Sequence, residues 1–184
     1  MVGRLISTKP QTCSMASRIV SPVLRRFLFR FFAIFLVVEV FLSVFPPLYF
    51  QEWLARVIGN ILDIPVQGIF VSVNAIRFEI SPFCTGLSTI GLWLGLVYGF
   101  PFPPGKEKIR YALVGGVMII LLNVIRLLGI VYAGMVSSAA NVDALHTLTW
   151  FIMSALACGM WYYLLAQKTG TFNTQKIAQK LLEM

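Results

Sequence analysis

The stretch IRYALVGGVMIILLNVIRLLGIVYAGMV, residues 109–136, decides what kind of protein this chain is. It is longer than the roughly 20 apolar residues that a helix needs to cross the hydrocarbon core of a bilayer. Near its middle stand two strongly polar residues, Asn123 and Arg126. We therefore expect a membrane-spanning helix that carries two polar side chains at depth.

The overall composition extends this expectation to the whole chain. Of its 184 residues, 58% are hydrophobic and 12% are charged, whereas soluble domains are about half apolar and a quarter charged. A chain of this length has room for one domain with four membrane spans. The formal net charge is +8, and basic residues beside apolar spans usually fix orientation and hold anionic lipid headgroups. We expect contact with membrane lipids and no nucleic acid.

Three further apolar stretches complete the set of spans. The first runs from Phe27 until Pro46 and Pro47 break it, and it exceeds the apolar core of a signal peptide, so we expect a retained anchor. The second runs from about Cys84 to Phe100, and the last from about Thr147 to Ala166. The predicted fold is an α-helical polytopic membrane protein with about four transmembrane helices.

Between the first two spans the pattern changes. Residues 52–64 have helical spacing, with Trp53 at headgroup depth, which predicts an interfacial helix. Residues 65–81 alternate between apolar and polar on either side of Asn74, which predicts a small extracytoplasmic β-hairpin.

Basic residues near the ends of the spans predict the orientation, because they favour the cytoplasmic side. One side of the predicted membrane holds most of them: Arg4, Lys9, Arg18, Arg25, Arg26, Arg30, Lys106, Lys108, Arg110, Lys168, Lys176 and Lys180. The other side holds Arg56 and Arg77. We expect both termini in the cytoplasm, with residues 1–26 as a basic segment, residues 27–167 as one integral-membrane domain, and residues 168–184 as a basic amphipathic tail.

This topology brings three reactive side chains to the extracytoplasmic face. Cys84 opens the second span, and His146, the one histidine of the chain, precedes the last span. Arg126 lies about 24 Å beyond Arg110 at 1.5 Å per helical residue. A thiolate beside an imidazole is an acyl-transfer pair, in which a cation stabilises the oxyanion. Cys84 is the predicted nucleophile, His146 the proton carrier and Arg126 the oxyanion stabiliser.

Local signals suggest how Cys84 is presented. We expect Ser81 to cap the second span and Pro82 to occupy its first helical position. Cys84 would then lie in the first turn, where the helix dipole favours a thiolate. Gly86 would allow another backbone or side chain to approach closely.

Three other residues are predicted to support the site. Asn123 lies one turn before Arg126, and Glu39 lies at similar depth in the first span, so both could orient the arginine by hydrogen bonds or charge. Asp143 could orient His146 if the segment between them is helical.

Each of these residues also has a plain structural interpretation. A cysteine in a membrane helix is commonly inert filling, which suits Cys158, and Arg126 could reach the headgroups instead of a partner. The rival function is a small transporter or a scaffold subunit that uses Arg126 and Glu39 as a polar pair. A thiol oxidoreductase would want a second outward cysteine, and without a CxxC or His-rich cluster we expect no metal and no other cofactor.

Three short motifs resemble those of a known family. FCTGL at 83–87, NVIRL at 123–127 and a histidine before the last span, His146, are similar to motifs of the exosortase/archaeosortase family. In that family the cysteine is usually followed by Ser or Ala and then Gly, whereas this chain has Thr85. The family's arginine follows an asparagine by three residues, as it does here.

The resemblance implies a function as well as a fold. Members are polytopic, cysteine transpeptidase-like enzymes that process exported proteins bearing a C-terminal sorting signal: a motif, one transmembrane helix and a basic end. It implies cleavage on the extracytoplasmic side by Cys84, Arg126 and His146, and transfer to a lipid or other surface acceptor. With fewer spans than many members, the chain resembles a minimal core.

The predicted hairpin leads directly into Cys84. An exposed strand edge there could align an extended substrate segment through main-chain hydrogen bonds. Replacing Ile76 or Phe78 with proline should then impair processing more than membrane insertion.

Overall fold

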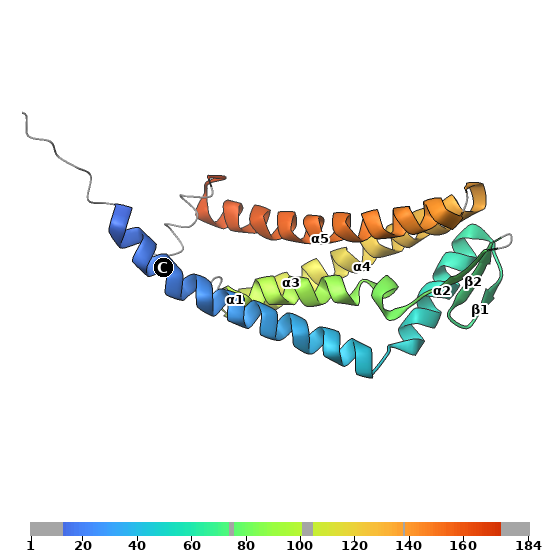
Figure 1. Cartoon of the computed structure of the whole chain (residues 1–184), viewed down its shortest axis with the longest axis horizontal. Coiled ribbons are helices and arrows are strands. Elements are labelled where there is room, and N and C mark those ends of the chain that lie inside the picture. Colours follow the sequence, from blue (N-terminus) through green and yellow to red (C-terminus); the bar gives the residue numbers. More distant parts are fainter. Residues whose placement is uncertain (1–12, 74–75, 101–104, 138, 174–184) are drawn as a thin grey trace, which may run out of the picture.

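The computed structural model of the chain describes residues 13–73, 76–100, 105–137 and 139–173. These residues form helices and short strands in the order α1 Cys13–Val44, α2 Leu48–Leu62, β1 Val66–Gln67, β2 Phe70–Val73, β3 Ile76–Glu79, the one-turn 3-10 helix η1 Pro82–Thr85, α3 Leu87–Gly99, α4 Gly105–Val136 and α5 Ala139–Thr169. Helices α1, α3, α4 and α5 run along the long axis, and α2 and the sheet gather at one end (Figure 1).

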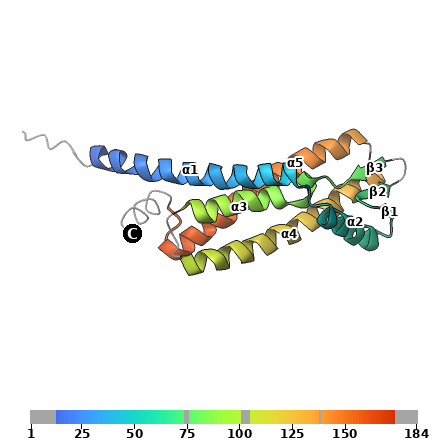
Figure 2. The same cartoon turned by 90° about the horizontal axis from the view of Figure 1, so that it is seen from below.

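The predicted membrane fold is confirmed. Within the described residues, three helical segments are long and apolar enough to cross a bilayer: Leu24–Val44, Gly105–Val136 and Asn141–Thr169. Helix α3 is apolar but has 13 residues, which is about 20 Å of helix. It packs against α1, α4 and α5, and the view from below shows it running among the longer helices (Figure 2).

A glycine stripe explains how α1 approaches α3 so closely. Gly91, Gly95 and Gly99 recur every four residues on the face of α3 that meets α1. A Cβ at Gly95 would lie 2.9 Å from the Phe31 ring and 3.2 Å from the Phe31 carbonyl oxygen, and one at Gly91 would lie 2.8 Å from Val38. Small residues at this spacing let two membrane helices pack backbone to backbone.

The predicted β-hairpin is also confirmed, and a third strand extends it. Strands β2 and β3 pair antiparallel, with Val71 opposite Phe78 and Val73 opposite Ile76. The turn residues 74 and 75 between them lie outside the described residues. Strand β1, which was not predicted, pairs with the other edge of β2.

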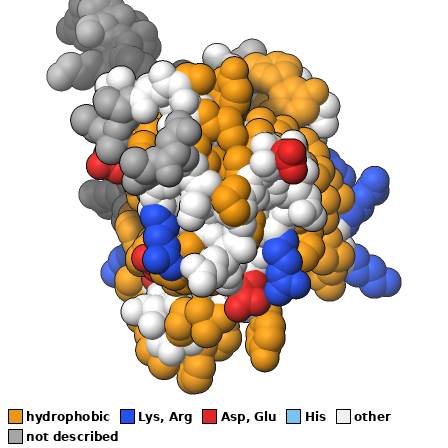
Figure 3. Space-filling model, turned by 90° about the vertical axis from the view of Figure 1, so that its right-hand side faces the viewer, with side chains coloured by type: hydrophobic (Ala, Val, Ile, Leu, Met, Phe, Trp, Pro, Cys, Tyr) orange, Lys and Arg blue, Asp and Glu red, His pale blue; other side chains and the backbone are white. Residues whose placement is uncertain are grey.

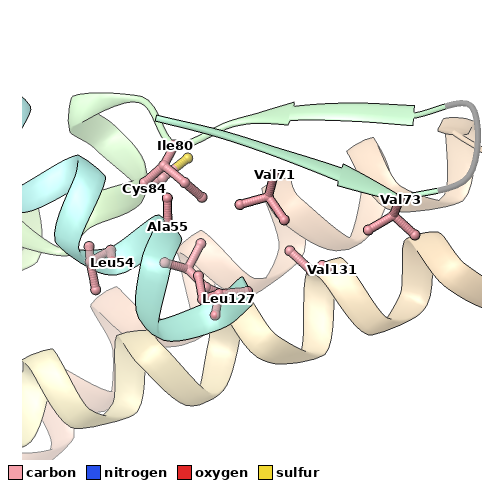
Figure 4. Packing of buried hydrophobic residues seen from close by; sticks show 9 residues of the cluster. Leu54, Ala55, Val71, Val73, Ile80, Cys84, Leu127 and Val131 are labelled. Atoms are coloured by element: carbon pink, nitrogen blue, oxygen red, sulfur yellow. The ribbon is translucent and has the colours of Figure 1, made fainter. Parts of the chain in front are cut away.

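The sheet shares one apolar core with α2, η1 and α4. Leu54 and Ile58 of α2, Val71 of β2 and Leu127 of α4 are buried together with Cys84. Figure 4 shows Cys84 beside Ile80 within this cluster. The predicted interfacial helix is therefore α2, which begins at Leu48 and docks the sheet onto the end of the bundle.

Two local predictions about the site were wrong: the start of the helix next to Cys84 and the start of the last helix. Ser81 makes no side-chain cap bond, and Pro82–Thr85 form the separate turn η1. Gly86 then takes a left-handed conformation with φ 79°, so α3 begins only at Leu87. Cys84 therefore precedes the α-helix, and the predicted first-turn dipole effect does not apply to it. Helix α5 begins eight residues earlier than the predicted span, so His146 lies inside a helix.

The described chain begins and ends at the same end of the bundle, opposite the sheet (Figure 1). At the sheet end, basic and acidic side chains are scattered among apolar ones (Figure 3). The predicted amphipathic tail falls mostly on residues 174–184, which lie outside the described residues.

Candidate active site

The site centres on a thiol–imidazole contact between two distant parts of the chain. Cys84 Sγ lies 3.3 Å from His146 Nε2, although 62 residues separate them. Turn η1 supplies the cysteine, and the second turn of α5 supplies the histidine. Cys84 is 7% exposed. The pair has the spacing at which a thiol proton can pass to an imidazole nitrogen.

Ser81 adds a second contact to the sulfur. Its Oγ donates to Cys84 Sγ at 3.3 Å. Ser81 was predicted to cap a helix, so its contact with the sulfur was not predicted. A hydroxyl donor stabilises negative charge on the atom that accepts its hydrogen bond. Cys84 thus lies between one donor and one potential proton acceptor.

Turn η1 is held by its own side chains. Thr85 Oγ1 donates to the Pro82 carbonyl at 2.5 Å and accepts from the Leu87 N–H at 3.3 Å. The Cys84 N–H donates to the Ser81 carbonyl at 2.9 Å. Thr85 is fully buried. A threonine at this position therefore closes the turn that presents the thiol.

Asn123 and Gly86 dock this turn onto α4. Asn123 Nδ2 donates to the Cys84 carbonyl at 2.8 Å, and the side chain is buried. A Cβ on residue 86 would lie 2.9 Å from Asn123 Cγ. Glycine is needed here both for its positive φ and because the amide side chain occupies the adjoining space.

Arg126 is buried and holds both halves of the site. Its Nη1 donates to Asn123 Oδ1 at 3.2 Å, its Nη2 to the His146 carbonyl at 3.3 Å, and its Nε to Thr149 Oγ1 at 2.9 Å. Thr149 in turn donates to the His146 carbonyl at 3.0 Å. Arg126 is 9% exposed, and its hydrogen-bond partners lie on α4 and α5.

Thr149 was not among the predicted site residues. A signal was present, since Thr149 lies three residues after His146 and would share its face of a helix. That spacing is informative only within a helix, and His146 was expected in a loop.

The other two predicted supporting residues are not joined to the site by hydrogen bonds. Glu39 lies on α1, which packs on α3, and its buried Oε1 has no hydrogen-bond partner among the described residues. Asp143 is exposed and lies one turn before His146. No hydrogen bond joins it to the imidazole within the part of the chain that the structure describes.

A pocket of about 290 Å³ opens beside the thiol. Cys84 and His146 line it together with β3, apolar residues of α4, and Val142 and Asp143 of α5. Arg126 does not line it. Cys84 therefore borders a pocket whose lining does not include Arg126.

No group of His, Cys, Asp or Glu that could hold a metal ion occurs among the described residues.

Comparison with known proteins gives the site a context. The sequence profile of transmembrane exosortases (Exosortase_EpsH) matches residues 14–163. The chain is also 35% identical over 104 residues to the probable archaeosortase D of Methanocaldococcus jannaschii, an overlap of 54% of this chain and 64% of that protein. No solved structure matches the chain. The profile covers the sheet, the whole candidate site and the spans up to residue 163, and the chain therefore belongs to the transmembrane exosortase family.

Proposed function

We propose that this chain is a membrane cysteine peptidase-transpeptidase that cleaves C-terminal sorting signals from exported proteins through a thioester intermediate. The observation that carries this proposal is the 3.3 Å contact between Cys84 Sγ and His146 Nε2 beside an open pocket. Family membership supports a sorting role in general, and the substrate would carry a motif, one transmembrane helix and a basic end.

Acylation begins with transfer of the Cys84 proton to His146. The sulfur then attacks the scissile carbonyl carbon, and the carbonyl oxygen takes the negative charge of the tetrahedral intermediate. When the C–N bond breaks, the histidinium gives its proton to the leaving amine. The products of this half-reaction are an acyl-thioester on Cys84 and the released C-terminal signal.

Deacylation reverses the proton flow. His146 takes a proton from an acceptor nucleophile on a lipid or another surface molecule, and the nucleophile attacks the thioester carbonyl. The Cys84 thiolate leaves and is protonated again. With water as the nucleophile the same site acts as a peptidase.

Arg126 supports both half-reactions by position and charge. Three of the five N–H groups of its guanidinium hold Asn123, Thr149 and the His146 carbonyl. Through Asn123 it also fixes the Cys84 carbonyl. A fixed positive charge behind the reacting pair favours negative charge on the sulfur and on the tetrahedral intermediate.

We also propose the orientation in which both termini are cytoplasmic and the sheet end is extracytoplasmic. The test uses a chain whose three cysteines are replaced by serine, with one new cysteine at an exposed position. A membrane-impermeant maleimide should label Asn60→Cys in α2 on intact cells and should label Gln167→Cys in α5 only after permeabilisation. The opposite pattern would reverse the assignment.

The function is tested by comparing cells that carry the wild-type chain with cells that carry Cys84→Ala. C-terminal proteomics should find exported proteins that lose their C-terminal segment in wild-type cells and keep it in Cys84→Ala cells. Purified enzyme incubated with such a protein should form an adduct on Cys84 that hydroxylamine releases.

Three further variants, Cys84→Ser, Arg126→Ala and His146→Ala, separate the rival function from this one. A transporter or scaffold built on Arg126 would tolerate Cys84→Ser and lose function with Arg126→Ala. The proposed enzyme loses processing with either change, and also with His146→Ala. Unchanged processing in Cys84→Ala cells would refute the proposal.

A further inference from the structure

One edge of the small sheet carries no partner strand. The strand order is β1-β2-β3, so β2 is central and the outer edge of β3 is unpaired by any strand in the described chain. Unpaired edges present rows of backbone N–H and C=O groups that can pair with another extended chain.

The register identifies the groups that this edge presents. The Ile80 N–H donates to the Ile69 carbonyl, and the Ser72 N–H donates to the Pro65 carbonyl on the far side of β2. Antiparallel pairs alternate between hydrogen-bonded and non-hydrogen-bonded. Phe78 and Val71 therefore form a hydrogen-bonded pair, whereas the backbone groups of Arg77 and Glu79 point away from β2.

Three backbone groups remain available at the edge. The Glu79 carbonyl accepts from the Ser81 N–H at 3.0 Å. Within the described residues, that leaves the N–H and C=O of Arg77 and the N–H of Glu79 without a hydrogen-bond partner. Three such groups suffice to align about two or three residues of an extended peptide.

This edge forms one wall of the pocket that contains the reacting pair. Every residue from Ile76 to Ser81 lines the pocket, together with Cys84 and His146, and α5 lines it with Val142 and Asp143. The chain runs from β3 through Ser81 directly into η1. A peptide laid along β3 would therefore lead toward the sulfur.

The edge is short and charged, which suits a selective binding site. Arg77 and Glu79 are exposed, and the Arg77 guanidinium lies 3.9 Å from the centre of the Phe70 ring. Short edges with charged side chains resist pairing between copies of the same chain. Such an edge therefore suits a short peptide segment in the pocket better than a second copy of the sheet.

We propose that the substrate segment next to the scissile bond binds as an added strand on the outer edge of β3, paired with Arg77 and Glu79. This inference rests on the proposed function and adds how the substrate is recognised. Main-chain pairing holds the segment extended and brings its scissile carbonyl to Cys84 Sγ. Specificity comes from the alternate side chains that face the apolar residues of α4.

The strand register shows at which positions proline can test strand pairing. The N–H groups of Ile76 and Phe78 point toward β2, so proline at either position would break the sheet itself. Apart from the arginine side chain, Arg77→Pro removes only an outward N–H, which an edge strand tolerates. Arg77→Ala is the matched control, because it loses the same side chain and keeps the N–H.

The probe is a peptide that covers the cleaved segment of a protein found to accumulate in Cys84→Ala cells. We expect kcat/KM for Arg77→Pro to be roughly 5-fold below that of Arg77→Ala, the effect of one backbone hydrogen bond, with equal Tm values. Phe78→Pro should lower Tm sharply. If Arg77→Pro unfolds, Glu79→Pro and Glu79→Ala form the second pair.

A second test modifies the peptide and uses wild-type enzyme, so an unfolded enzyme variant cannot account for its result. N-methylation of one backbone amide at a time should impair cleavage with a period of two, because alternate N–H groups face β3. Equal kcat/KM for the proline and alanine variants, or a scan without alternation, would overturn strand pairing while cleavage itself stands. Failure to find any accumulating substrate would remove the proposed function and this inference together.

Discussion

Replacing Gly86 with alanine should damage both stability and processing, because two separate effects meet at this residue. Gly86 has a φ of 79°, and alanine in the left-handed region costs roughly 1–2 kcal/mol. The new Cβ would also lie 2.9 Å from Asn123 Cγ and 3.0 Å from Asn123 Cβ. Asn123 must then move away from the turn that it holds.

The second effect can be estimated from the bond that Asn123 would lose. Its Nδ2 donates to the Cys84 carbonyl at 2.8 Å in a buried site, and leaving such a group unpaired costs about 1–3 kcal/mol. The total for Gly86→Ala is then about 2–5 kcal/mol. Processing should fall by roughly 10-fold or more, because Asn123 also positions Arg126.

Gly68→Ala is the matched control. Gly68 has a φ of 61°, so alanine carries a similar backbone strain there, but nothing lies within 4 Å of its Cβ. The difference between the two variants isolates the contact with Asn123. We expect Gly86→Ala to unfold in detergent at a Tm roughly 2–12 °C below that of Gly68→Ala, and Gly68→Ala to process substrate at nearly the wild-type rate.

Equal Tm values and equal processing rates for the two variants would refute the reasoning, because they would mean that Asn123 accommodates the Cβ without loss. A double variant adds a second check. Asn123→Ala removes the Cγ that the new methyl group meets, so the effects of Gly86→Ala and Asn123→Ala on stability should be less than additive by 0.5 kcal/mol or more, the scale of coupling between contacting residues.

Two further substitutions test the contacts around the site and within the bundle. Thr149→Val keeps the side-chain shape and removes the oxygen that accepts from Arg126 Nε at 2.9 Å. We expect the free energy of unfolding to fall by about 1–3 kcal/mol and processing to fall with it. An unchanged Tm would contradict this. Gly95→Val would place its Cβ 2.9 Å from the Phe31 ring and separate α1 from α3, whereas nothing lies within 4 Å of a Cβ at Gly116. The yield of folded protein in membranes should therefore fall for Gly95→Val and hold for Gly116→Val, and equal yields would argue against close α1–α3 packing.

The turn that presents Cys84 shows why local signals were not enough. Ser81 followed by Pro82 is compatible with the start of an α-helix and also with a single 3-10 turn. Gly86 decides between them, because its left-handed conformation interrupts the chain before Leu87. Glycine also occurs inside α3, at Gly91 and Gly95, so its presence alone did not predict the break.

The partners of Arg126 show a second limit. Asn123 was predicted as a partner because it lies one turn before Arg126, and it accepts a hydrogen bond from Arg126 Nη1. Glu39 was predicted because it lies at a similar depth in the first span. Depth does not give the lateral arrangement of helices, and α1 packs on α3 instead of α4. Arg126 consequently faces α5, where it meets Thr149 and the His146 carbonyl.

The sequence by itself determined the membrane spans, the hairpin and the level of Cys84, Arg126 and His146 along the bundle. These features depend on apolar length, on periodicity and on the rise per residue, all of which are local properties of a chain. Only the tertiary structure decided the lateral features: the 3.3 Å contact between Cys84 and His146, the hydrogen bonds by which Arg126 joins α4 to α5, and which backbone groups of β3 face outward beside the thiol. Those depend on how side chains from distant segments pack against one another, and a single helix or strand does not contain that information.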